Sequence, residues 1–262
     1  MNRLFIVKIG GEVLDQPENL KSFLQDFAAI KEAKILIHGG GKIASNIGNQ
    51  LSIESKYVNG RRITDADTLD LVTMVYGGLV NKQIVAGLQV LKCNAIGLTG
   101  ADGNILAAKK RAVKEIDFGF VGDIEAKDVN VPLLYFLLKQ NAVPVFAPLT
   151  HADGTILNTN ADTIAKVLAV AMSKHFDVRL IYCFDKAGVL KNIEDENSVI
   201  PVLDNAQYKA GLAEGIFANG MLPKLENAFE AIHQGVKEVL IGHAQHLLKN
   251  TKAKTIGTLI TK

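Results

Sequence analysis

Apolar residues gather in short continuous runs along this chain and do not alternate with polar ones. Six runs rich in Val, Ile, Leu and Phe cover positions 4–9, 34–38, 95–99, 142–148, 179–183 and 237–241. Strands that are buried on both faces of a sheet have this composition, and the intervening segments are long enough for helical crossovers. The pattern predicts an α/β fold with a mainly parallel central sheet that is covered by helices on both sides.

One predicted helix is much longer than the others and runs from Asp65 to Leu91. Its apolar residues follow i, i+3, i+4 spacing: Leu69, Val72, Tyr76, Leu79, Val80, Ile84, Leu88 and Leu91. The pair Gly77-Gly78 predicts a bend or a close approach of another backbone. A core helix and a subunit interface both fit this pattern. A second, smaller feature at 118–124 predicts a short hairpin.

The polar stretch Ser173–Asp177 is the best candidate for a boundary between two lobes. We expect a larger N-terminal lobe at 1–176 and a smaller C-terminal lobe at 177–262. No internal repeat or low-complexity linker interrupts either part.

Charge and composition exclude several classes of protein. The 29 Lys and Arg residues nearly balance 27 Asp and Glu residues, which disfavours a nucleic-acid-coating or membrane-surface protein. No run reaches the ~18–20 apolar residues of a membrane span, and the first residues do not form a secretion signal. Cys93 and Cys183 lie in apolar surroundings and form no CxxC pair, which predicts buried, reduced thiols in a cytoplasmic protein.

The strongest local motif is HGGGKIA, from His38 to Ala44, which follows a predicted strand and opens a helix. Its glycines allow a ligand to approach the backbone, and N–H groups at a helix start attract anions. The P-loop pattern fails here at two positions. The dinucleotide pattern GxGxxA fits Gly39, Gly41 and Ala44, so an NAD(P)-dependent oxidoreductase is an alternative. Against it, no acidic residue ends a clear following strand.

Two lysines occupy positions that packing does not explain. Lys8 lies at the end of the first apolar run, next to Gly10-Gly11, where the carboxyl ends of parallel strands bind ligands. It could also reach solvent from an edge strand. Lys224 follows Pro223 in the first turn of a predicted helix, where the helix dipole disfavours a cation. A bound anion would resolve this conflict.

Two further polar motifs leave two interpretations open. Asp162 in NTNADTIAK falls in the first helical turn, where it either stabilises the helix dipole or serves as a pocket carboxylate. The pair Arg61-Arg62 is either solvated or grips a carboxylate through a guanidinium fork. The six histidines show no zinc-binding spacing, so we expect no metal ligands in the chain.

The motifs VKIGG, HGGG, NGRRIT, NTNAD and NGMLPK, in this order, resemble those of the amino acid kinase family. The resemblance runs from Lys8 to the C-terminal TLIT. It implies an open αβα sandwich that holds an acyl-glutamate in the N-terminal lobe and ATP, with its Mg²⁺, in the C-terminal lobe. The implied reaction phosphorylates the side-chain carboxylate of N-acetyl-L-glutamate, or of N-succinyl-L-glutamate, in the second step of arginine biosynthesis.

The resemblance also implies roles for individual residues. Lys8 and Lys224 would stabilise the transferring phosphoryl group, with Asp162 orienting both lysines and Gly11 against the phosphoryl oxygens. The implied acyl-glutamate ligands are Gly40, Gly41, Arg62 and Asn158. The implied nucleotide-binding residues are Asp185, Lys186, Ala187, Gly188, Val189, Leu190, Ile216, Phe217 and Ala218. Phe184 departs from the family pattern, which has Thr or Ser before the aspartate of the nucleotide loop.

The resemblance bears on assembly and regulation as well. Arginine-sensitive family members carry an extra helix before the first strand, and Lys8 is already the eighth residue here. We therefore expect a homodimer without feedback inhibition by arginine, with the long helix at the two-fold interface. A non-catalytic amino-acid sensor on the same fold is a further alternative, which the complete set of catalytic residues disfavours.

Overall fold

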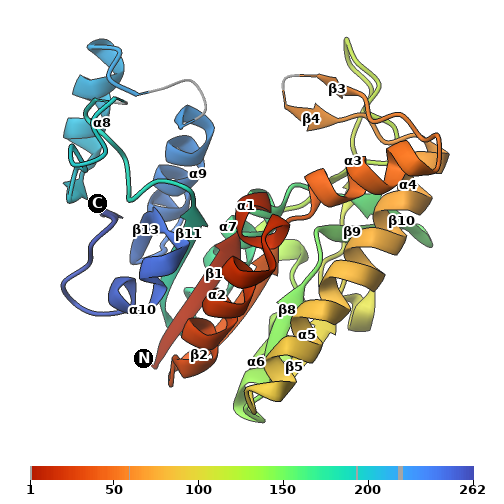
Figure 1. The fold of residues 1–262 in the computed structure, drawn as a ribbon, viewed down its shortest axis with the longest axis horizontal. Helices are drawn as coiled ribbons and strands as arrows, with labels where there is room; N and C mark the ends of the chain where they lie inside the picture. Colours follow the sequence, from red (N-terminus) through yellow and green to blue (C-terminus); the bar gives the residue numbers. More distant parts are fainter. Residues whose placement is uncertain (1, 59, 193, 218–220) are drawn as a thin grey trace.

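The computed structural model describes residues 2–58, 60–192, 194–217 and 221–262. Within them, one eight-stranded sheet runs through the molecule in the order β12-β14-β13-β11-β1-β2-β8-β5 (Figure 1). Its pairs are parallel except that β13 and β14 run antiparallel. The strands are β1 (Arg3–Ile9), β2 (Ala33–His38), β5 (Ala95–Leu98), β8 (Val143–Phe146), β11 (Asp177–Phe184), β12 (Val202–Leu203), β13 (Glu238–His243) and β14 (Thr258–Ile260).

The six apolar runs form six of these strands, and the predicted α/β class is confirmed. In β1, Leu4 and Ile6 enter one hydrophobic cluster, whereas Phe5, Val7 and Ile9 enter a second cluster on the opposite face. Both faces of the sheet are therefore buried, which explains why these strands carry continuous apolar runs. The short edge strand β12 and its neighbour β14 were not predicted.

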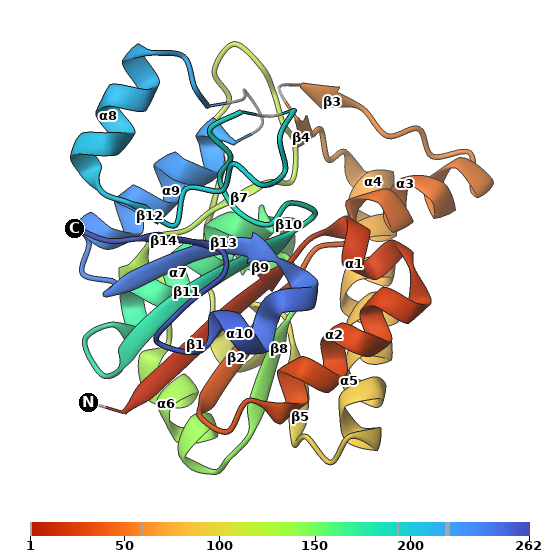
Figure 2. The same ribbon diagram turned by 60° about the vertical axis from the view of Figure 1, so that its left-hand side comes forward.

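Helices cover both faces of the sheet (Figure 2). On one face, α6, α7 and α9 pack in the cluster that contains Leu4, while α2 and the long helix pack on the other face. The helices are α1 (Gly11–Asp15), α2 (Pro17–Ala29), α3 (Gly41–Gln50), α4 (Ala66–Val72), α5 (Asn81–Val90), α6 (Val131–Lys139), α7 (Ala161–Met172), α8 (Asn205–Ala213), α9 (Leu222–His233) and α10 (Leu247–Asn250).

The predicted long helix is present and continuous, but its middle is a π-helix. The segment η1 (Thr73–Val80) joins α4 to α5 and contains both glycines of the Gly77-Gly78 pair. Asp65 caps the helix start by accepting a hydrogen bond from the backbone N–H of Thr68. By length and mean hydropathy alone, Ala66–Val90 could cross a membrane, and 44% of the 18-residue window that meets this criterion is buried inside the protein.

In the part of the chain that the structure describes, three two-stranded hairpins lie outside the central sheet. They pair β3 (Tyr57–Val58) with β4 (Arg61–Arg62), β6 (Lys109–Lys110) with β7 (Gly122–Asp123), and β9 (Leu149–Ala152) with β10 (Thr155–Asn158). The hairpin predicted within 118–124 was therefore placed too narrowly, because the partner of Gly122–Asp123 is Lys109–Lys110. The intervening loop packs along Thr64, which exchanges backbone hydrogen bonds with Phe118 and Phe120.

The two expected lobes share the central sheet. The polar break at Ser173–Asp177 separates the end of α7 from β11, and β11 pairs with β1 along its length. The lobes diverge only beyond the carboxyl ends of the strands, where Figure 1 shows β3 and β4 on one side and α8 on the other. Cys93 and Cys183 are free and buried.

Candidate active site

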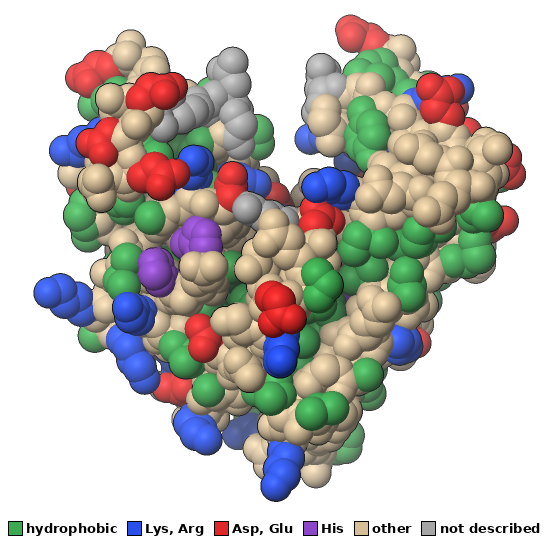
Figure 3. Space-filling model, in the orientation of Figure 1, with side chains coloured by type: hydrophobic (Ala, Val, Ile, Leu, Met, Phe, Trp, Pro, Cys, Tyr) green, Lys and Arg blue, Asp and Glu red, His purple; other side chains and the backbone are tan. Residues whose placement is uncertain are grey.

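The carboxyl ends of the central strands lie below a cleft between the two lobes, which the space-filling view shows as a deep notch (Figure 3). β1 ends at Ile9, β2 at His38 and β11 at Phe184, in matching register. In open α/β sheets this edge is where ligands bind.

Lys8, Asp162 and Lys224 form one ionic cluster. The Lys8 ammonium lies 2.7 Å from Oδ1 of Asp162, and the Lys224 ammonium lies 3.5 Å from Oδ2. Lys8 shares a face of β1 with Leu4 and Ile6, so its side chain points toward α7 and α9, the helices that carry its two partners. The structure thus brings together three residues from distant parts of the sequence.

The Asp162 side chain is 16% exposed and is held in place by α7 itself. Asn160 caps this helix, since its side chain accepts hydrogen bonds from the N–H groups of Asp162 and Thr163. Burial acts to raise the pKa of Asp162, but Lys8 and Lys224 outweigh burial, and the pKa lies below its ordinary value. The carboxylate is therefore charged, and it serves both the helix dipole and the lysine pair.

Two glycine segments meet beside this cluster. The N–H of Gly39 donates to the carbonyl of Ile9, 3.1 Å away, which ties the HGGG segment to the end of β1. Gly11 is the first residue of α1, and Gly41 is the first residue of α3. Gly40 has φ +146°, and an added Cβ would lie 3.0 Å from the Tyr76 ring, so both conformation and contact require glycine here.

Arg62 is 7% exposed and lies between α3 and the loop that precedes β3. Its guanidinium donates to the Gly41 carbonyl at 2.8 Å and to the hydroxyls of Ser45 and Ser55. Tyr57 packs against it, with its ring centroid 4.8 Å away. Among the side chains that the structure describes, no carboxylate pairs with Arg62. A buried guanidinium without a counter-charge favours an anionic ligand.

Asn158 ends β10 on the same side of the cleft. Its side-chain amide donates to the Thr64 hydroxyl at 3.0 Å, and its backbone N–H donates to the Phe120 carbonyl. Thr64 follows Arg62 in sequence by two residues. The 111–121 loop and the β3–β4 hairpin therefore form one wall with Asn158.

The residues that resemble a nucleotide site belong to two segments of the predicted C-terminal lobe, one directly after β11 and one after α8. Gly188 is tightly packed, because an added Cβ would lie 2.7 Å from the Thr258 hydroxyl. Val189 and Phe217 are buried in one hydrophobic cluster, against which Ile216 packs, and Lys186 forms a salt bridge with Glu196. The remaining members of the predicted set are Asp185, Ala187 and Leu190, whereas Ala218 lies outside the described residues. Because the side chains of Val189 and Phe217 are buried, these two residues could contact a nucleotide only through their backbone atoms.

Several residues at the site were missed by sequence reasoning. Ser45 and Ser55 hold Arg62, and Tyr76 covers Gly40 from the π-helical segment. His38 is fully buried, and Asn81 donates to its Nε2 atom at 3.2 Å. Burial lowers the pKa of His38 to about 4, so its ring is neutral near pH 7. These contacts join residues that are far apart in sequence. The one signal for them in the sequence is the apolar spacing of the long helix, which includes Tyr76.

The described residues contain no group of three or more His, Cys, Asp and Glu side chains that could hold a metal ion. The dinucleotide alternative also loses its structural context. The strand that follows α3 is β3, which lies outside the central sheet, whereas that motif requires a neighbouring parallel strand with an acidic end.

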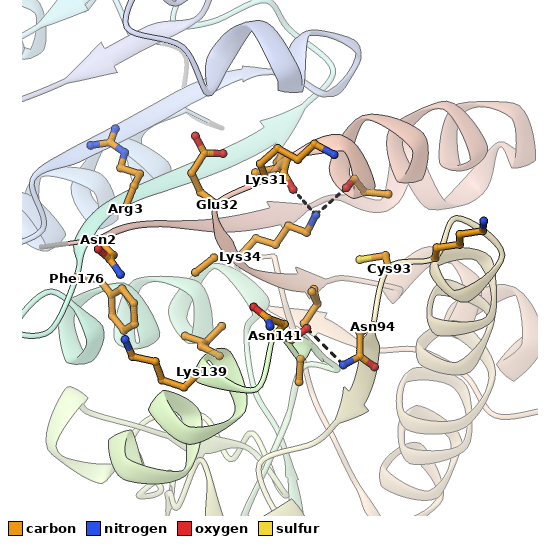
Figure 4. Close-up of a pocket in the computed structure, with 17 residues that line it drawn as sticks. Asn2, Arg3, Lys31, Glu32, Lys34, Cys93, Asn94, Lys139, Asn141 and Phe176 are labelled. Carbon is orange, nitrogen blue, oxygen red and sulfur yellow. Dashed lines mark hydrogen bonds between the residues drawn. The ribbon is translucent and has the colours of Figure 1, made fainter.

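A cavity of about 740 Å³ lies at the opposite edge of the sheet, by the amino ends of the strands (Figure 4). Lys34 is the most buried cation there. Its ammonium donates to the carbonyls of Phe27, Ala28 and Ile30 at the end of α2, so it acts as a helix cap. Its hydrogen bonds are directed at the protein and not at the cavity.

Comparison with known proteins identifies relatives over nearly the whole chain. The model of the amino acid kinase family matches residues 3–243. An acetylglutamate kinase of Parabacteroides distasonis is 55% identical over 248 residues, which cover 94% of this chain and 96% of the relative. One of Bacteroides thetaiotaomicron is 55% identical and covers 99% of each. The structure of a carbamate kinase from Giardia lamblia bound to AMP-PNP shares the fold at TM-score 0.72 and 15% identity, covering 100% of this chain and 99% of that one.

Proposed function

Because this chain belongs to the amino acid kinase family, we propose that it catalyses ATP-dependent phosphorylation of the side-chain carboxylate of N-acetyl-L-glutamate, in arginine biosynthesis. The acetylglutamate kinases to which it is similar support this assignment along their full length. The observation that carries the proposal is the pair of ammonium groups, of Lys8 and Lys224, held on one partly buried aspartate at the cleft.

The chemistry requires cations more than it requires a base. A glutamate side chain has a reference pKa of ~4.3 and is already ionised at neutral pH. The difficulty is bringing two anions together, since unit charges 4 Å apart repel by ~4 kcal/mol at an effective dielectric constant of ~20. Preorganised cations and helix N-termini reduce that repulsion without reorganising during the reaction.

The roles of the residues follow from this need. A carboxylate oxygen of the substrate attacks the γ-phosphorus, forming a new P–O bond, while the bond to the ADP oxygen breaks and ADP takes both electrons. Lys8 and Lys224 neutralise the developing charge, and Asp162 keeps the two ammonium groups in place. Gly11 lies against the phosphoryl oxygens. Magnesium arrives bound to the phosphates of ATP as part of the substrate.

The N-terminal lobe, 1–176, holds the acyl-glutamate in this proposal. Arg62 grips the α-carboxylate, which supplies the counter-charge that the buried guanidinium lacks among the described side chains. Gly40, Gly41 and Asn158 bind the rest of the molecule. The C-terminal lobe, 177–262, binds ATP along Asp185–Leu190 and residues 216–218.

We further propose that the protein is a homodimer that pairs through the long helix and the edge strand β5. Exposed apolar side chains gather on these two elements: Met74 is 57% exposed, Leu79 41%, Val90 84% and Ile96 38%. Such a surface favours a protein partner over solvent. The free, buried thiols of Cys93 and Cys183 agree with a reducing, cytoplasmic compartment.

A hydroxamate assay tests the proposed reaction and its acyl preference. Hydroxylamine traps acyl phosphates, so ATP-dependent hydroxamate forms only when a carboxylate of the acceptor is phosphorylated. Glutamate, N-acetyl-L-glutamate and N-succinyl-L-glutamate are compared side by side. We expect the highest kcat/KM with N-acetyl-L-glutamate. Hydroxamate from N-succinyl-L-glutamate alone would reassign the acyl group, and no hydroxamate from any acceptor would reject the reaction.

A further inference from the structure

The glycine loop contains a buried hydrogen-bonded pair to which the reaction above assigns no task. His38 is the last residue of β2 and has no exposed surface, and Asn81, at the end of the π-helical segment, is 1% exposed. Buried polar side chains are costly unless their hydrogen bonds are satisfied. The contacts of this pair therefore indicate what it maintains.

The orientation of the Asn81 amide is fixed by two neighbours. Its nitrogen donates to the Val145 carbonyl at 2.9 Å, and its oxygen accepts from the Lys82 ammonium at 3.3 Å. The same nitrogen therefore faces Nε2 of His38 and donates to it at 3.2 Å. An amide nitrogen cannot accept, so Nε2 of the neutral ring is the acceptor and the proton lies on Nδ1.

The protonated Nδ1 atom then acts on the backbone of the loop. It lies 2.6 Å from the Gly39 carbonyl and donates to it. The described chain contains no cis peptide bond, so the N–H of Gly40 points opposite to the Gly39 carbonyl, away from the buried ring. Among the described residues, the N–H groups of Gly40 and Gly41 have no acceptor, and they are the groups that the site offers to an anion.

The π-helical segment explains how Asn81 reaches His38 while Tyr76 covers Gly40. In an α-helix, residues five apart are separated by about 140° around the axis. The i→i+5 bonds of a π-helix bring such residues close to the same face, and the N–H of Asn81 donates to the Tyr76 carbonyl. On β5, a Cβ at Gly97 would lie 2.0 Å from the Asn81 oxygen, so this glycine leaves room for the amide.

We propose that His38 and Asn81 are positioning residues: the Asn81 amide fixes the His38 tautomer, which turns the Gly39 peptide so that the Gly40 N–H faces the substrate. This proposal rests on the proposed kinase function, because its readout includes phosphoryl transfer. Neither residue touches the substrate. The π-helical segment is the part of the long helix that contacts the glycine loop, through Tyr76 at Gly40 and through Asn81, at its end, at His38.

Two amide substitutions at His38 separate its two contacts. His38→Asn places an amide nitrogen where Nδ1 lies and keeps the bond to Gly39, whereas His38→Gln places its amide near Nε2 and keeps only the contact with Asn81. We expect kcat of His38→Asn within about threefold of the wild type. We expect His38→Gln to lose about tenfold or more, approaching the ~10²–10³-fold loss of a preorganised donor. KM for ATP should change less than about twofold in both.

A spectroscopic measurement tests the tautomer without any substrate. Two-bond ¹H–¹⁵N spectra of the labelled protein, with His38 assigned by its loss in His38→Asn, should show the Nδ1–H form in the wild type. Asn81→Leu should lose that form and lower kcat, whereas Gln83→Leu, an exposed amide on the same helix, should change neither. Melting temperatures establish that each variant is folded.

Each other result overturns the proposal. An Nε2–H tautomer in the wild type contradicts it directly. Equal kcat in His38→Asn and His38→Gln, or a higher kcat in His38→Gln, shows that the Gly39 contact does not set the rate. If the wild-type protein phosphorylates no acyl-glutamate, the proposed function fails while the tautomer measurement still decides the geometry.

Discussion

At the scale of single residues, the site depends on one carboxylate shared by two ammonium groups. The Lys224 ammonium is 3.5 Å from Asp162, and the Lys8 ammonium is closer, at 2.7 Å. The sequence indicated a ligand-binding role for both lysines, because packing or the helix dipole disfavours a cation at each position. It left Asp162 undecided between helix dipole and pocket, and in the structure the carboxylate serves both.

Replacing either lysine should damage the reaction more than the fold. We expect Lys8→Ala and Lys224→Ala each to lower kcat by about 10²–10³-fold, because each removes one preorganised transition-state contact. Single-turnover kinetics and thermal unfolding measure the two effects separately. Lys21→Ala, on the exposed surface of α2, is the matched control. A folded variant that keeps wild-type turnover would remove that lysine from the phosphoryl site.

Arg62 and its neighbour Arg61 offer a second matched pair. Arg62 is buried against Gly41, whereas Arg61 is exposed. Arg62→Lys keeps the charge but loses the fork, so we expect KM for the acyl-glutamate to rise about tenfold or more, as when a charged hydrogen bond of ~1.5–3 kcal/mol is lost. KM for ATP should stay unchanged, and Arg61→Lys should resemble the wild type. An unaltered acyl-glutamate KM in Arg62→Lys contradicts its assigned role.

At the scale of elements, the sheet was the most predictable part of the molecule. Strands such as β1 and β11 are buried on both faces, and that burial leaves a direct trace in composition. The edge strand β12 and its neighbour β14 are two and three residues long, too short for such a pattern. The sequence indicated the π-helical segment only through its glycine pair, and the contacts of Tyr76 with Gly40 and of Asn81 with His38 join residues that are far apart in sequence.

Glycine substitutions test the contacts of the long helix. Gly97→Ala should lower both the free energy of unfolding and kcat, because its Cβ would lie 2.0 Å from the Asn81 oxygen and displace the amide from His38. Gly78→Ala is the control, since an added Cβ there has no neighbour within 4 Å. Urea unfolding and steady-state kinetics measure the two effects. A Gly97→Ala protein as stable and active as Gly78→Ala would show that the amide tolerates displacement.

An ionic network at the amino ends of β1, β11 and β13 makes stability depend on acid pH. Arg3 bridges Asp177 and Glu238. Burial acts to raise the pKa of both carboxyls, but hydrogen bonds from Lys237 and Arg3 to Asp177, and from Arg179 and Arg3 to Glu238, hold both below their ordinary values of 3.8 and 4.5. Their contribution is therefore present above about pH 4.5 and is lost as pH falls through the lowered values.

Melting temperatures between pH 3 and pH 7 measure this dependence. We expect Arg3→Gln to lower the melting temperature at pH 7 and to reduce its further decrease toward pH 3. Lys127→Gln, which breaks the exposed Lys127–Glu125 pair, should leave the curve unchanged. Parallel curves for the wild type and Arg3→Gln would show that Arg3 does not perturb the two carboxyls.

At the scale of the whole molecule, one sheet carries both of the proposed sites. The apolar runs allowed the strands of the central sheet to be predicted, but not which side chains meet between distant elements. Asp162 and Lys224 are 62 residues apart, and His38 and Asn81 are 43 apart. A pattern within one element carries no information about which distant side chain meets it, so the site required the structure.

If the proposed dimer is correct, the oligomeric state of the protein depends on the exposed apolar side chains of the long helix and β5. Light scattering should give the mass of two chains at micromolar concentration, and Met74→Glu with Val90→Glu should shift the protein toward one chain. Val113→Glu, at an exposed apolar position in the 111–121 loop, should not. A wild-type protein with the mass of one chain at every concentration would contradict the dimer.

The central claim is that a phosphoryl group moves from ATP to the side-chain carboxylate of N-acetyl-L-glutamate between Lys8 and Lys224. Phosphorus NMR of the wild-type protein with MgATP and this substrate measures that transfer directly. We predict one acyl-phosphate signal for each ADP formed, its loss on adding hydroxylamine, and a far slower appearance in Lys8→Ala. ADP that forms only together with inorganic phosphate, or an acyl phosphate that forms equally fast in Lys8→Ala, would contradict the account.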